Sequence, residues 1–263
     1  MNLVVFHLKK TPGLDKISAR YVKLGSPALS CILSVLINEC FATGKFPQSL
    51  KIARVTPIYK EGPRDISSNY RPISILSVIS KLIEKLTYDR LIKFINKKSI
   101  LNNNQFGFRT AHSTVHAIAT IHERILENVD NDKHTISIYL DLSKAFDCVN
   151  HSILLSKLEH YGIRGIALKF LKSYLTNRQQ LTVVNGEASD LLTVLCGVPQ
   201  GSTLGPLLFL LYINDLPSAS TSYISLFADD AYLVMSHNSY ATSENTTKSS
   251  NSIYFPFSAI SKT

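Results

Sequence analysis

Three aspartates have surroundings that suit chemistry: Asp141, Asp229 and Asp230. Asp229 and Asp230 are adjacent in LFADDAYLV, between the apolar runs SYISL and AYLVM. This pattern predicts a strand, a tight turn and a second strand, with both carboxylates at the tip of the hairpin. Adjacent carboxylates repel each other and are costly near apolar groups unless cations accompany them. A solvated turn explains the pair equally well by itself, because Asp is common in turns.

Asp141 lies far upstream in a similar setting, TISIYLDLSKAFD, and this favours the chemical interpretation. In residues 135–142, apolar side chains alternate with Ser137, Tyr139 and Asp141, which predicts a strand whose polar face ends in a carboxylate. If this strand pairs with the hairpin, three carboxylates converge. Mg²⁺ prefers oxygen ligands and is commonly held by one or two carboxylates together with substrate phosphates. Two such ions about 4 Å apart support phosphoryl transfer, in a polymerase or in a nuclease.

The composition is that of a folded, basic protein. Of the 263 residues, 45% are hydrophobic and 18% are charged, and the net charge is +9 with a pI near 9.3. Such an excess of positive charge favours an anionic partner, nucleic acid before a membrane surface. The charges are spread along the chain, which suits a groove that follows a phosphate backbone. Solubility alone remains the simpler explanation of the charge.

Four cysteines (Cys31, Cys40, Cys148 and Cys196) show no spacing typical of zinc ligands or of a disulfide framework. We therefore expect a reducing, intracellular compartment. The opening MNLVVFHLKK has no positive region before its apolar run, so we predict no signal peptide. No apolar run reaches the roughly 18 residues of a spanning helix, and we expect no membrane partner.

Hydrophobic periodicity predicts the elements that position these residues. Helices are expected within 11–24, over 26–43, 77–97, 114–129, 151–161, 165–176 and 206–216; strands are expected over 52–59 and 135–142, and hairpins around Asn185-Gly186 and Asp229-Asp230. The helix over 114–129 should turn these residues inward: Val115, Ile118, Ile121, Ile125 and Leu126. Asn150 or Asp147 can cap the helix that follows the first acidic strand.

Residues 60–72 are expected to form a loop that carries Lys60, Arg64 and Arg71. Such a basic loop can wrap a phosphate, although composition alone favours an ordinary solvated loop. Helices early in the chain and strands later predict an α+β fold with two lobes. From about Ser236 the chain is rich in Ser, Thr and Asn, and we expect a weakly ordered tail.

Several motifs occur in the order of a known family. IYLDLSKAFDCVNH, CGVPQGSTLGPLLFLLYINDLP and LFADD resemble the reverse transcriptases of non-LTR retrotransposons, the LINE-type elements of the jockey kind. RVTPIYKEG, NYRPISIL and NQFGFRTAHST resemble the fingers of that family, so the resemblance runs from about residue 11 to 236. It implies the fingers and palm of a right-hand polymerase, with an antiparallel palm sheet packed on helices. The implied division is an N-terminal extension with fingers (1–135), a palm (136–236) and a tail (237–263), with no match to a thumb, as in a truncated copy.

The resemblance also implies roles for the acids. Asp141, Asp229 and Asp230 match catalytic, metal-binding positions, and Leu142 matches a position whose backbone carbonyl lies near a metal. The implied cofactor is Mg²⁺, as two ions, with Mn²⁺ as a substitute. Asp147 is part of the same motif, although a helix cap is a sufficient role for it.

Five further positions match the family's nucleotide site. Phe146 matches the aromatic residue that excludes a ribose 2′-hydroxyl, and core packing is its rival role. Gln200 and Gly201 match residues near the incoming nucleotide. Arg71 and, less directly, Lys60 match fingers cations that hold the triphosphate, a role for which the forked guanidinium of Arg is suited.

The implied function is RNA-directed DNA polymerase, a nucleotidyltransferase that adds a deoxynucleotide to a primer 3′-hydroxyl. Its partners would be an RNA template, a DNA primer and dNTP, with the nucleus as the location by family. The alternative is a catalytically inactive, truncated remnant that only binds RNA or RNA–DNA hybrid. A two-metal nuclease would use the same acids, but Phe146 and Gln200 fit nucleotide selection, which a nuclease does not need. Host, template and oligomeric state stay open.

Overall fold

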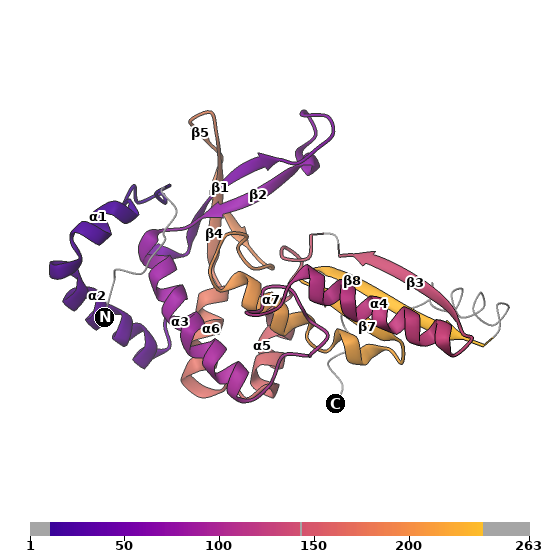
Figure 1. Cartoon of the computed structure of the whole chain (residues 1–263). Helices are drawn as coiled ribbons and strands as arrows, with labels where there is room; N and C mark the ends of the chain where they lie inside the picture. The colour runs from indigo at the N-terminus through magenta and orange to yellow at the C-terminus, as the bar shows by residue number, and fades with distance from the viewer. Residues whose placement is uncertain (1–10, 143, 239–263) are drawn as a thin grey trace. The chain divides into compact units, whose positions relative to one another are not determined.

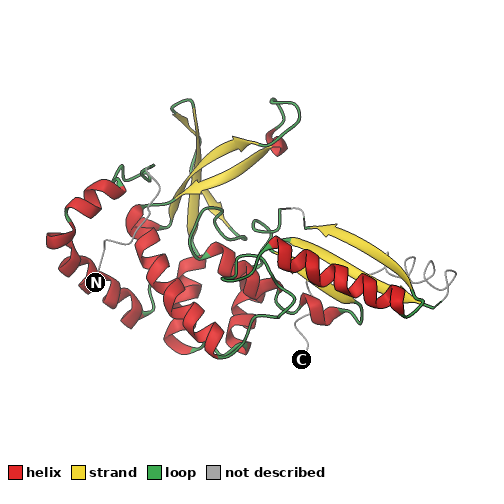
Figure 2. Cartoon of the chain, viewed as in Figure 1, coloured by secondary structure: helices red, strands yellow, loops and turns green. Residues whose placement is uncertain are grey.

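The computed structural model describes residues 11–142 and 144–238, which form two compact units. Unit 1 comprises Met1–Lys98 and Phe146–Leu211, and unit 2 comprises Ser99–Ala145 and Tyr212–Thr263, so each unit joins two separate stretches of chain (Figure 1). Helices and strands occur in both units (Figure 2), and the predicted α+β class is confirmed. Most of the predicted tail, residues 239–263, lies outside the described residues.

The helices of unit 1 follow the predicted periodicity closely. They are α1 (Ala19–Leu24), α2 (Ser26–Thr43), α3 (Val78–Lys97), α5 (His151–His160), α6 (Gly165–Leu175) and most of α7 (Gly205–Ile213). The start of α3 is capped by the Ser77 hydroxyl, which accepts a hydrogen bond from the Ile79 N–H. Gly44 ends α2 in the left-handed conformation, with φ of 65°. Only Ala19–Leu24 of the predicted 11–24 segment is helical, because a turn closes at Lys16 and the Ser18 side chain caps the helix.

Unit 1 also contains a five-stranded sheet of order β2-β1-β4-β5, with β6 added on β4. The strands are β1 (Ile52–Tyr59), β2 (Tyr70–Ile75), β4 (Arg178–Val184), β5 (Glu187–Ala188) and β6 (Leu192–Val194), with short 3₁₀ turns at Gln48–Leu50 and Ser67–Asn69. Strand β1 pairs antiparallel with β2 and parallel with β4. The parallel pairing ends at Val55, so Pro57 lies beyond it, where its missing N–H costs no hydrogen bond to β4.

The predicted hairpin at Asn185-Gly186 is confirmed. Val183 pairs with Ala188 and Val184 with Glu187, which leaves two residues in the turn. Both turn residues have positive φ, 53° at Asn185 and 91° at Gly186. This is the type I′ geometry that Asn-Gly favours, so the local sequence was sufficient to predict the turn.

Unit 2 is a three-stranded antiparallel sheet with one helix packed along it (Figures 1 and 2). The strands are β3 (His134–Asp141), β7 (Tyr223–Phe227) and β8 (Asp230–His237) in the order β3-β8-β7, and the helix is α4 (Thr114–Asp130). A 3₁₀ turn at Leu216–Ala219 precedes β7. The core of the sheet is β8, where residues 231–235 are all buried.

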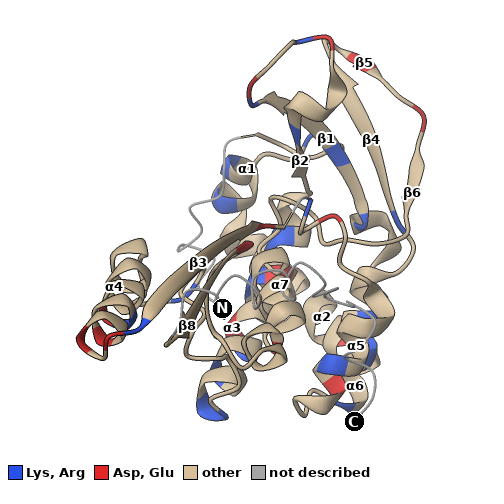
Figure 3. Cartoon of the chain, turned by 90° about the vertical axis from the view of Figure 1, so that its right-hand side faces the viewer, with Lys and Arg blue, Asp and Glu red and all other residues tan. Residues whose placement is uncertain are grey.

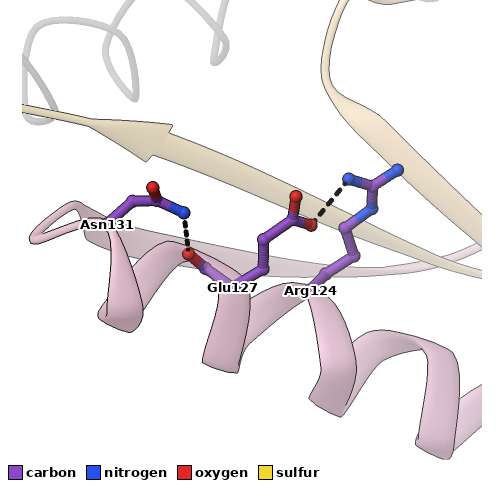
Figure 4. Close-up of polar contacts among 3 residues, drawn as sticks. All are labelled: Arg124, Glu127 and Asn131. Atoms are coloured by element: carbon purple, nitrogen blue, oxygen red, sulfur yellow. Dashed lines mark hydrogen bonds and ion pairs between the residues drawn. The ribbon is translucent and has the colours of Figure 1, made fainter.

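The predicted inward face of α4 is wrong at three of its five residues, while Ile121 and Ile125 are half-buried as expected. Val115, Ile118 and Leu126 are exposed, and Ala117 is the buried residue of this helix. Apolar residues lie on two overlapping stripes of α4, and packing on the sheet selects the stripe through Ala117. Near the end of the helix, Arg124 forms an ion pair with Glu127 at 3.0 Å, and the Asn131 amide donates to the Glu127 carbonyl at 2.6 Å (Figure 4).

Helix α2 carries an apolar surface that the sequence analysis did not weigh. Within the described residues it is the one helix long and apolar enough to cross a membrane by length and composition. Its side chains at Ile32 and Val35 are about two-thirds exposed. Core helices of soluble proteins and signal sequences meet the same criterion, so this is weak evidence for a membrane.

Candidate active site

The strand register of unit 2 brings the predicted acids together. Asp141, the last residue of β3, is paired with Asp230, the first residue of β8. Directly paired residues of antiparallel strands project from the same face of a sheet. Asp229 occupies the two-residue turn between β7 and β8, next to Asp230. The three acids therefore belong to one corner of the sheet, because the predicted strand pairs with the predicted hairpin, the condition on which their convergence depended.

The turn that carries Asp229 has an uncommon backbone. Ala228, the first of its two residues, has φ of 58°. A non-glycine residue in this region costs roughly 1–2 kcal/mol, so surrounding contacts must hold it there. Ala228 is buried, and its N–H donates to the side-chain oxygen of Gln105 at 3.0 Å. Gln105 is not among the residues predicted from the sequence to act at the site.

The pKa of Asp230 reflects both its burial and the two neighbouring acids. Partial burial, then the charges of Asp229 and Asp141, raise the pKa of Asp230 above its ordinary value. Within residues 11–142 and 144–238, no Lys or Arg forms an ion pair with any of the three acids. The site therefore has an excess of negative charge that a cation would relieve.

The donor chemistry of this corner suits a hard divalent cation, since every side-chain donor is a carboxylate oxygen. Among the described residues, however, no group of three or more His, Cys, Asp or Glu side chains could hold a metal ion by itself. Substrate phosphates commonly complete the coordination of Mg²⁺. The Leu142 carbonyl, the fourth predicted ligand, accepts a hydrogen bond from the Ala145 N–H at 3.1 Å.

Unit 1 holds Gln200 in place by its backbone and its side chain. The Gln200 carbonyl accepts from the Ser74 N–H at 2.7 Å, and its Nε2 donates to both carboxylate oxygens of Asp147 at 3.1 Å. Gly201 has φ of 108°, and a Cβ there would lie 2.8 Å from the Ser74 carbonyl oxygen. Glycine is therefore needed at this position for the approach to β2, whatever binds nearby.

The structure assigns Asp147 a partner that the sequence analysis missed. Asn150 caps α5, because its side-chain oxygen accepts from the N–H groups of Ser152 and Ile153. Asp147 instead receives the Gln200 amide. Asp147 and Gln200 are 53 residues apart in the chain, so local sequence patterns could not pair them and the contact became visible only in the fold.

Phe146 packs against a neighbouring ring in unit 1. Its ring lies 4.6 Å from the Phe209 ring, centroid to centroid, with an interplanar angle of 26°. The Phe146 carbonyl also accepts from the Val198 N–H at 2.8 Å. Phe146 as a whole is half-buried, and its stacking on Phe209 restricts the orientation of the ring.

The two predicted fingers cations lie on the β1-β2 ribbon. Arg71 is part of β2 and pairs with Ile58, so the expectation that it lies in a loop is wrong. Pro72 is compatible with a strand here, because an edge strand tolerates proline. Lys60 follows β1 directly and forms an exposed ion pair with Glu61 at 3.2 Å. Lys and Arg occur on strands as well as on helices of the described residues (Figure 3).

A buried carboxylate supports the segment around Gln200. Glu84 of α3 is fully buried and accepts from the Thr203 N–H at 2.7 Å and the Tyr174 hydroxyl at 3.1 Å. Burial raises the pKa of Glu84, while the hydrogen bond from Thr203 and the charge of Arg178 act in the opposite direction. The signal in the sequence was a charged residue within the apolar stripe of 77–97.

The fold is that of a polymerase with fingers and palm. The chain is similar to a telomerase from Candida tropicalis in complex with a telomeric RNA fragment, with a TM-score of 0.53, 14% identity and coverage of 86% of this chain and 42% of that one. It is also similar to the apo telomerase truncated from its C-terminal domain, with a TM-score of 0.51, 15% identity and coverage of 93% and 55%. At such identities these likenesses establish the fold alone.

The chain belongs to the reverse transcriptase (RNA-dependent DNA polymerase) family, whose model matches residues 58–251. It is 34% identical over 246 residues to a probable RNA-directed DNA polymerase from transposon BS of Drosophila melanogaster, covering 88% of this chain and 26% of that protein. It is 33% identical over 213 residues to the RNA-directed DNA polymerase from mobile element jockey of the same organism, covering 80% and 23%.

The resemblance to jockey-like retrotransposon enzymes is thereby confirmed. The chain spans about a quarter of the length of these relatives. Reverse transcriptases as a family depend on divalent metal ions, which agrees with the carboxylate chemistry of the corner formed by β3 and β8.

Proposed function

We propose that this chain is the polymerase domain of a retrotransposon protein and adds deoxynucleotides to a DNA primer on an RNA template. The observation that carries the proposal is the pairing of Asp141 with Asp230, with Asp229 in the adjoining turn. These three carboxylates have no ion-pair partner among the described residues. Bound cations would therefore relieve their mutual repulsion.

The proposed metal ligands are the carboxylates of Asp141, Asp229 and Asp230 and the carbonyl of Leu142. Two Mg²⁺ ions, or Mn²⁺ in their place, would supply an activated primer hydroxyl and stabilise the leaving oxygen when bound. Asp141 and Asp230 extend from regular strands, and strands hold ligands more rigidly than loops do. The chain's own contribution is thus to keep repelling carboxylates at a fixed separation before the cations arrive.

Nucleotide selection is assigned to the residues of unit 1. Phe146 stacks on Phe209, and a ring held in this way would exclude a 2′-hydroxyl. Gln200 is oriented by Asp147, so its amide is fixed before a nucleotide binds. Arg71 and Lys60 would contact the triphosphate, and Arg71 is exposed on its strand with its charge available to an anion.

The experiment is incorporation of labelled dTTP on a poly(rA)/oligo(dT) hybrid with Mg²⁺ or Mn²⁺. Three proteins are compared: the unaltered chain, Asp229→Ala, and the matched control Asp190→Ala, whose exposed side chain lies outside the site. We expect incorporation by the unaltered chain and by the control, and none by Asp229→Ala. Incorporation that survives Asp229→Ala refutes the proposed role of the acids.

The same proteins distinguish the binding-only alternative. If folded, unaltered chain incorporates nothing, the polymerase proposal fails for this chain. Salt-sensitive binding of the hybrid that Asp229→Ala leaves unchanged would then identify a remnant that holds nucleic acid through its basic surface.

A further inference from the structure

A short segment of unit 2 runs beside the strand that leads into the acidic turn. The Phe106 N–H donates to the Leu226 carbonyl, and the Leu226 N–H donates to the Asn104 carbonyl, both at 2.8 Å. These bonds form a parallel bridge between Gln105 and Leu226 of β7. The segment therefore pairs with the edge of β7 through a single residue, near the turn that carries Asp229.

The side chain of Gln105 forms hydrogen bonds with the backbone of the turn. It is 1% exposed, and its Oε1 accepts from the N–H groups of Ala228 at 3.0 Å and Gly107 at 2.8 Å. Its Nε2 lies 3.4 Å from the Ala228 carbonyl oxygen, at the long end of hydrogen bonding. The amide thus contacts both backbone polar groups of the residue that precedes Asp229 and that has a φ of 58°.

The approach of this segment to the turn requires glycine at position 107. A Cβ on Gly107 would lie 2.1 Å from the backbone nitrogen of Ala228, a distance at which the two chains must separate. The buried amide of Gln105 and the close approach of Gly107 are therefore two independent contacts with Ala228.

We propose that Gln105 is a positioning residue for Asp229 and Asp230. It holds Ala228 in its unfavourable conformation and so aims the carboxylates of the next two residues at the cations they bind. This inference rests on the proposed function of the acids, and it concerns a buried residue that is not among the proposed ligands. A neutral amide suits the role, because it satisfies backbone groups without adding charge beside three carboxylates.

The test replaces Gln105 by Met, which keeps the length and volume but leaves the Ala228 and Gly107 N–H groups unsatisfied. We expect kcat for dTTP incorporation to fall at least tenfold, while KM for dTTP and the affinity for the hybrid change less than twofold. Gln180→Met, on β4 of unit 1, is the matched control and should keep kcat within twofold. A higher KM for dTTP, or a lower affinity for the hybrid, with kcat unchanged overturns the inference.

A second variant separates positioning from general support of the fold. Glycine adopts a φ of 58° without penalty, so Ala228→Gly should make the turn less dependent on the clamp. In the Ala228→Gly background, Gln105→Met should lower kcat less than threefold. An equal loss in both backgrounds, or loss of the cooperative thermal transition in Gln105→Met, shows a structural role and overturns the inference.

A readout without turnover keeps the two proposals distinguishable. Hydrogen–deuterium exchange of the peptide covering 226–230, and Mn²⁺ binding followed by water-proton relaxation, report the turn and the acids directly. We expect Gln105→Met to speed exchange at the Ala228 amide and to weaken Mn²⁺ binding at least threefold. If the unaltered chain incorporates no nucleotide, the polymerase proposal fails alone; if exchange and Mn²⁺ binding are unchanged in Gln105→Met, the positioning inference fails.

Discussion

Replacing Asp230 by Asn should stabilise the metal-free protein at neutral pH while it removes a proposed metal ligand. Partial burial and the charges of Asp229 and Asp141 raise the pKa of Asp230 in the folded chain. A carboxyl with a higher pKa in the folded state binds its proton more tightly there, so protonation favours folding. The stability is therefore present below the unfolded pKa of about 4 and is lost as pH rises through the folded value.

The expected gain follows from the register of the strands. Directly paired residues place their Cβ atoms about 4.5–5.5 Å apart, so the Asp141 and Asp230 carboxylates lie within about 6 Å of each other. Asp230 is exposed, so a dielectric near that of water applies, and the repulsion at 6 Å is about 0.7 kcal/mol. After screening by salt, we expect Asp230→Asn to raise the free energy of unfolding by about 0.5 kcal/mol.

Urea unfolding in the presence of a chelator measures this gain. Asp230→Asn is compared with the unaltered chain at pH 7 in low salt, at pH 7 in about 1 M NaCl, and near pH 3.5, below the raised pKa of Asp230, where its protonated carboxyl no longer repels the other two. The gain should shrink in the second and third conditions, and Asp190→Asn should show none of it. A destabilised Asp230→Asn, or a gain that neither salt nor acid reduces, would refute the account of repulsion.

Three further outcomes are expected. Glu84→Leu should lower the free energy of unfolding by about 3 kcal/mol in urea titrations, because two donors and a nearby guanidinium lose a buried carboxylate, whereas Glu84→Gln should cost less. Asp147→Ala should raise KM for dTTP several-fold in steady-state kinetics, with a smaller change in kcat, because Gln200 loses its fixed orientation; an unchanged KM contradicts that role. Phe146→Val should raise incorporation of ribonucleotides relative to deoxynucleotides at least tenfold, measured as the ratio of the two kcat/KM values, and an unchanged ratio contradicts the steric account.

Local signals predicted most elements of both units. The alternation of 135–142 and the apolar runs around Asp229 predicted β3 and the acidic hairpin, since a period of two assigns each residue to a face. Asn185-Gly186 predicted its turn, because few residues adopt positive φ readily. Such signals succeed where neighbours in sequence decide the conformation.

Prediction from the sequence failed where contacts with distant residues decide between conformations that the local sequence allows equally. The two apolar stripes of α4 were both compatible with a helix, and only packing on the sheet buried Ala117 and left Val115 exposed. Arg71 follows a loop and precedes a proline, and only pairing with Ile58 made it part of a strand. Propensity is a weak guide in such cases, because tertiary contacts override it.

The acidic corner of unit 2 combines both situations. The acids are visible in the sequence because their setting is local: strands that end in carboxylates and a turn between apolar runs. Their precise aim depends on Ala228, whose conformation is unfavourable by itself and whose stabilising partner, Gln105, lies 123 residues earlier in the chain. Since repulsion among the carboxylates also opposes the arrangement, the turn is held by contacts that have no local signature, and a fragment lacking 104–107 would keep the motif and lose its geometry.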